Sequence, residues 1–136
     1  MHKIRVFLLL PIFLIFFSNY SFTQTKTPSK AQIRDIARLA VKHLNTDNFE
    51  KSLETARKSL HYATIIKDDY LIAASYNVIG ANFDELSEFD KAILFYKKGL
   101  AHADKTDNDT IKNYINNNLG NVYCFEKKKY KKGIEF

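Results

Sequence analysis

Few side chains in this sequence stand at spacings that could do chemistry. The four histidines include no His-x-x-x-His pair of the kind that binds zinc on a helix, and no acids accompany them at ligand spacing. The sequence also lacks a phosphate-binding loop, a dinucleotide fingerprint and a serine nucleophile elbow. We therefore expect a protein that is not an enzyme, with no catalytic residue, no cofactor and no metal.

The acids of the segment DKTDNDT, residues 104–110, come nearest to a metal site. Asp104, Asp107 and Asp109 could suggest calcium, but the segment lacks the glycine and the distal glutamate of a calcium-binding loop. Asp109 is better explained as the N-cap of a helix that begins Thr-Ile-Lys, because a carboxylate there accepts hydrogen bonds from free backbone amides. We expect a helix start here rather than a calcium site.

Cys124 is the only cysteine, so no disulfide can form within the chain and packing must stabilise the fold. Only the lysines that follow it could activate the thiol, and we expect it to be inert. A disulfide between two chains remains open.

Asparagines are concentrated at residues 116–118 and again at 121. A side-chain amide both donates and accepts hydrogen bonds, so such a group could bind the backbone of an extended peptide. The alternative is that these side chains only solvate a helix face. Asparagine is a poor helix former, so its repeated use here reduces helix propensity, and both interpretations stay open.

The first 23 residues have the order of a secretory signal peptide. A short basic start is followed by a 12-residue apolar run, residues 6–17, and then by small and polar residues. We expect cleavage after Thr23 and export to the periplasm or cell surface. An uncleaved membrane anchor is less favoured, because the run is shorter than the ~20 residues that span a bilayer.

The net charge of +6 is unevenly distributed. Residues 24–125 hold 14 Lys or Arg and 13 Asp or Glu, so the body is nearly neutral, while five lysines crowd into the last eleven residues. With an export signal and no basic face, this favours solvated lysines over a nucleic-acid or lipid site. Contact with a membrane is expected only through the signal segment or a downstream region.

Helical spacing of apolar residues runs through everything after a polar leader at residues 24–30, so we predict an all-α domain over 31–136. The sequence also repeats at about 40 residues. The positions that keep this phase are small or aromatic: Ala40, Gly80 and Gly120; Phe49, Phe89 and Tyr130; Ser52, Ala92 and Gly133.

These repeated positions predict a helix, a tight turn and a second helix that begins at the aromatic residue. In the turn, Asp47 and Ser87 each stand three residues before an acid, which predicts a capping box. The small residues would let paired helices approach closely, and the aromatics would close the end of each pair. A single pair cannot bury its apolar face, so neighbouring pairs must stack.

The stretch SYNVIGANFDELSEFDKAILFYKKGL, residues 75–100, resembles a tetratricopeptide repeat (TPR). The resemblance implies a helix-turn-helix solenoid, a TPR-like superhelix of about two and a half units near 31–69, 70–108 and 109–136, the last incomplete. His43 takes an aromatic position in the first unit, so we expect it to be a half-buried structural residue. In the third unit we expect a solvent-facing turn at 127–129 and a new helix from Tyr130. The chain would then be the N-terminal part of an exported bacterial protein of this family.

In that family the first helix of each unit commonly lines a concave groove that holds peptides. Carried over to this sequence, the groove positions are Asn77 and Asp84 in the middle unit and Tyr114, Asn117 and Asn121 in the third, with Ala81 and Cys124 beside them. The resemblance therefore implies a non-enzymatic scaffold that binds a protein or peptide partner. The alternative is the periplasmic sensory region of a truncated sensor histidine kinase or transcriptional regulator.

Overall fold

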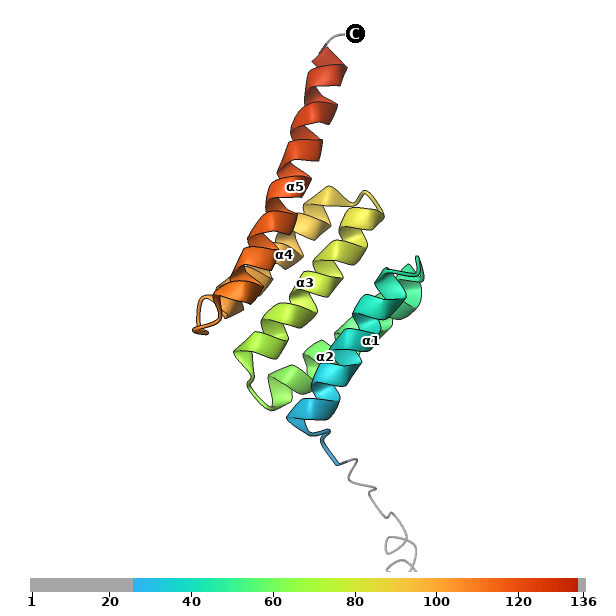
Figure 1. Ribbon diagram of the computed structural model, residues 1–136. Helices are drawn as coiled ribbons and strands as arrows, with labels where there is room; N and C mark the ends of the chain where they lie inside the picture. Colours follow the sequence, from blue (N-terminus) through green and yellow to red (C-terminus); the bar gives the residue numbers. More distant parts are fainter. Residues whose placement is uncertain (1–25, 135–136) are drawn as a thin grey trace, which may run out of the picture.

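The computed structural model describes residues 26–134, with side chains to Phe125, and shows five helices. They are α1 (Lys30–Leu44), α2 (Phe49–Ile65), α3 (Asp69–Glu85), α4 (Phe89–Ala103) and α5 (Asp109–Ile134). Successive helices are antiparallel, and α1, α3 and α5 form one layer in front of α2 and α4 (Figure 1). The all-α fold is confirmed. The expected signal segment, residues 1–23, lies outside the described residues.

The connections between helices are short, and three of them turn on a residue with left-handed backbone geometry. Asp47, Lys67 and Ser87 have φ of 56°, 54° and 58°, respectively. In each turn the next amide donates to a carbonyl five residues earlier, as in Glu88 N to Phe83 O at 2.8 Å. Such a left-handed residue ends one helix and reverses the chain.

The left-handed geometry corrects the predicted capping. Because Asp47 and Ser87 reverse the chain, the N-caps of α2 and α4 fall one residue later, at Asn48 and Glu88. The Asn48 side chain accepts from Lys51 N at 3.3 Å, whereas Glu88 makes no side-chain cap. The prediction that each second helix begins at an aromatic residue, Phe49 or Phe89, is confirmed.

The N-cap of α5 also differs from the expectation. Asn108 Oδ1 accepts from Ile111 N at 3.1 Å, and Asp109 is already the first residue of the helix. Asp104 forms an ion pair with Lys112 at 2.5 Å, which gives it a structural partner. Among the described residues, no group of three or more His, Cys, Asp or Glu side chains could hold a metal ion.

The core lies between the two layers and depends on small residues where helices meet. Ala40, Ala92 and Gly80 are buried. A Cβ added to Gly80 would stand 2.7 Å from two ring atoms of Tyr96, a side chain that is itself fully buried. This glycine therefore allows α4 to lie directly against α3.

The expected turn at residues 127–129 is wrong, because α5 continues without a break to Ile134. The segment EKKK, residues 126–129, contains no glycine, proline or short polar capping residue, and Glu and Lys are good helix formers. The side chain of Tyr130 and the surroundings of Gly133 lie outside the described part of the chain. Gly120 is exposed, and within that part nothing approaches its Cβ position within 4 Å.

Among the residues that the structure describes, four polar side chains are fully buried, and they link α2 to α3. Asn82 Nδ2 donates to Ser52 Oγ at 2.8 Å, and Ser52 Oγ donates in turn to the carbonyl of Ala40 on α1 at 2.9 Å. Ser75 Oγ donates to Ser59 Oγ at 2.9 Å. The bonds satisfy most of these groups, but Asn82 Oδ1 has no hydrogen-bond partner among the described residues.

Candidate peptide-binding surface

One face of α3 is left partly exposed. Ala74, Asn77, Ala81 and Asp84 follow one another at intervals of three or four residues, so they share one side of the helix. All four are partly exposed, whereas Val78, Ile79 and Gly80 between them are buried. Asn77 and Asp84, two of the expected groove residues, therefore lie on the same accessible stripe.

A corresponding stripe runs along α5. Tyr114, Asn117, Asn121 and Cys124 have the same spacing, and all are exposed, Tyr114 by 61%. The other flank of α5 packs inward through Ile115. Since α3 and α5 lie in the same layer, the two stripes belong to the surface formed by α1, α3 and α5 (Figure 1). We call it the front surface.

The two stripes are joined by a hydrogen bond that the sequence did not predict. Asn118 Nδ2 donates to Asn77 Oδ1 at 2.9 Å, from α5 to α3. The asparagines of α5 therefore have different roles. Asn118 links the two helices, while Asn117 and Asn121 are exposed. The signal for this division was the helical phase, because Asn118 lies on the inward flank with Ile111 and Ile115.

Asp84 lies at the carboxyl end of α3, and its environment disfavours the ionised form. Burial, followed by the repulsion of the neighbouring Glu85 carboxylate, raises the pKa of Asp84 above its ordinary value. A cationic group brought to this end of the front surface would relieve that unfavourable charge.

Removing the Asp84 charge should stabilise the fold at neutral pH. Because the folded-state pKa is raised, ionisation of Asp84 lowers stability as pH rises above the ordinary value of 3.8. We expect Asp84→Asn to raise the melting temperature slightly at neutral pH and to lose that advantage on acidification. Thermal melts of Asp84→Asn and of the exposed control Asp107→Asn over a pH series would measure this; an identical pH response in both would contradict it.

The first helix contributes one arginine and three apolar residues to the front surface. Counting back 40 residues from the α3 stripe gives Arg34, Ala37, Val41 and Leu44 on α1, of which Arg34 and Val41 are exposed. Beside them, Arg38 pairs with Asp35 at 3.2 Å on the same helix. His43 is half-buried on α1, as expected. The polar, amide-rich part of the front surface thus lies on α3 and α5.

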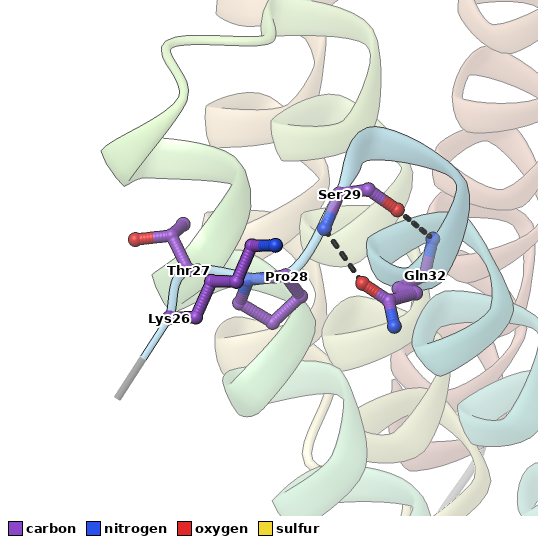
Figure 2. Close-up of a pocket in the computed structure, with 5 residues that line it drawn as sticks. All are labelled: Lys26, Thr27, Pro28, Ser29 and Gln32. Atoms are coloured by element: carbon purple, nitrogen blue, oxygen red, sulfur yellow. Dashed lines mark hydrogen bonds between the residues drawn. The ribbon is translucent and has the colours of Figure 1, made fainter. Parts of the chain in front are cut away.

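A hollow lies at the start of α1 (Figure 2). It is lined by residues 26–29 and Gln32. Its polar atoms cap the helix: Ser29 N donates to Gln32 Oε1 at 2.8 Å, and Gln32 N donates to Ser29 Oγ at 3.3 Å. These bonds form the capping box of α1, so part of the lining of the hollow stabilises the helix start.

No family model, curated protein or solved structure matches this chain. Within residues 26–134, no helix has the length and apolar character needed to cross a membrane. The geometry of the front surface is therefore the basis for a functional conclusion.

Proposed function

We propose that this chain is a non-enzymatic, exported scaffold of stacked helix pairs that binds an extended peptide on its front surface. The order of basic, apolar and small residues at 1–23 supports export. The accessible asparagines of α5, next to the bonded pair Asn77 and Asn118, carry the binding proposal. A peptide backbone offers alternating donors and acceptors, and an amide side chain can pair with either.

A tetratricopeptide-like repeat is supported by the agreement of structure at the 40-residue spacing. Residues 51–63 and 91–103 have the same sequence of buried, intermediate and exposed positions. The left-handed residues Asp47 and Ser87 are also 40 residues apart. Each such helix pair would bury its apolar face against the next pair, which leaves the first helices to form a continuous binding surface.

The proposal is tested with peptides selected from a random library on the immobilised full chain. We expect Asn117→Ala/Asn121→Ala to weaken the selected peptides by about tenfold or more, a loss of about 1.4 kcal/mol. The double variant keeps the buried flank of α5 intact, so it should fold normally by circular dichroism.

The matched control is Asn116→Ala, compared with Asn117→Ala alone. Both asparagines are exposed and adjacent on the same helix, but Asn116 lies about 100° around the helix axis from Asn117, away from the stripe of Tyr114, Asn117 and Asn121. Because the control matches the test variant in residue type and position along the helix, it removes any difference in helix propensity. Equal binding by the two single variants would show that the peptide does not use the front-surface amides.

A further inference from the structure

α5 presents a face that corresponds to the face of α3 covered by α4. On α3 that face centres on Gly80, against which the Tyr96 ring lies. Gly120 stands 40 residues later on α5, is exposed, and in the described part of the chain has nothing within 4 Å of its Cβ position. Tyr123, 43% exposed, stands where α3 has the buried Phe83. Among the described residues, the same kind of surface is covered on α3 and uncovered on α5.

The orientation of α5 supports this correspondence. Ile115 and Val122 are buried in the core cluster, as Ser75 and Asn82 are buried 40 residues earlier on α3. A Cβ on Gly99 of α4 would lie 3.1 Å from the Ile115 side chain, so this flank of α5 packs on α4. α5 thus packs on the preceding helix as α3 does, which leaves its Gly120 face turned to solvent.

Charge at the start of the two helices points to the polarity of an occupant. Asp69, the first residue of α3, lies 2.6 Å from His102 Nδ1 in the last turn of the antiparallel α4. It also lies 3.9 Å from Nζ of Lys105, two residues after that helix ends. Asp109 is the first residue of α5, again 40 residues later, and no ion pair to it occurs among the described side chains. A helix with a basic last turn, running antiparallel to α5, would complement Asp109.

We propose that the Gly120 face of α5 binds a separate amphipathic helix with the chemistry of α4. The occupant has a small residue and, four positions later, an aromatic residue, as Ala92 and Tyr96 have in α4. Its aromatic ring lies on Gly120, and its basic last turn pairs with Asp109. The contact continues the series of interfaces that α1 makes with α2 and α3 makes with α4.

The probe is a synthetic peptide of residues 88–105 carrying a fluorophore, titrated with the full chain while anisotropy is recorded. We expect saturable binding with one peptide per chain. Gly120→Leu in the chain and Tyr96→Ala in the peptide should each weaken binding by about tenfold or more, because each removes the ring-on-glycine contact. Gly120→Leu introduces its side chain into open space, so the chain should still fold.

A charge exchange tests the polarity of the bound helix. The peptide change Lys105→Glu should weaken binding, and Asp109→Lys in the chain should restore the affinity of that altered peptide. Asn117→Ala/Asn121→Ala should leave binding of the 88–105 peptide unchanged, which distinguishes the Gly120 face from the front surface. Absence of saturable binding, or binding that Gly120→Leu leaves unchanged, would overturn the proposal. A chain dimer in sedimentation that Gly120→Leu dissociates would also overturn it, since a second copy would then occupy the face.

Discussion

Gly80→Ala is expected to lower the free energy of unfolding by about 1–2 kcal/mol, whereas Gly120→Ala should raise it by about 0.5–1 kcal/mol. At Gly80 the new methyl would stand 2.7 Å from the Tyr96 ring, which is buried and cannot swing away. The resulting overpacking exceeds the gain in helix propensity. At Gly120 the methyl meets open space, and only the gain remains.

Urea unfolding of the two variants beside the wild type measures this difference. Gly99→Ala should fall between them, because its nearest contact is 3.1 Å. If the Tyr96 ring is the obstacle, Gly80→Ala should lose its penalty when introduced into a Tyr96→Leu background. Equal stability changes at Gly80 and Gly120 would mean that α4 does not lie against α3 as described.

Asn82→Asp should be among the most destabilising changes in the chain, by about 3–5 kcal/mol at neutral pH. Asn82 is fully buried, and the described residues offer no hydrogen-bond donor to its Oδ1, so a carboxylate there would be uncompensated. Burial would raise the pKa of the new carboxyl, so the loss of stability should grow as pH rises above the ordinary pKa of an aspartate.

The matched control replaces the Ser52–Asn82 pair with the apolar residues found 40 positions later. Ser52 and Asn82 correspond at the 40-residue spacing to Ala92 and Val122, both fully buried. Ser52→Ala/Asn82→Val should therefore retain stability within about 1 kcal/mol, because two bonded polar partners are replaced together by apolar groups. Chemical denaturation of both variants at neutral and acidic pH provides the test. If Asn82→Asp leaves the free energy of unfolding unchanged, this side chain must reach water.

The sequence was sufficient for the helical class and for the helix starts at Phe49 and Phe89, because apolar periodicity and aromatic spacing are local signals. It placed the caps one residue early because a left-handed Asp47 or Ser87 leaves no distinct sequence mark when the residue is not glycine. It also predicted a turn at 127–129, from the spacing of Tyr130 and Gly133. The high helix propensity of the Glu and Lys residues there opposed that prediction.

The candidate site was predictable in part, through helical phase. Asn77 and Asp84 share one stripe of α3, as do Tyr114, Asn117 and Asn121 on α5. The bond from Asn118 to Asn77 was not predictable, because it depends on how closely two helices 41 residues apart approach each other. The pairing of Ser52 with Asn82 was not predictable for the same reason, because a polar residue in a helical pattern does not indicate which buried residue it will bond.

Each helix packs only on its first and second neighbours along the chain. This arrangement has a consequence for how fast the chain folds. Within residues 26–134 no contact joins α1 to α4 or α5, so no long loop must close before stabilising contacts form. Chains dominated by local contacts fold fast, on a timescale of about microseconds to milliseconds. The same arrangement lets α1 and α2 open without disturbing α5, so hydrogen exchange should differ from one end of the domain to the other.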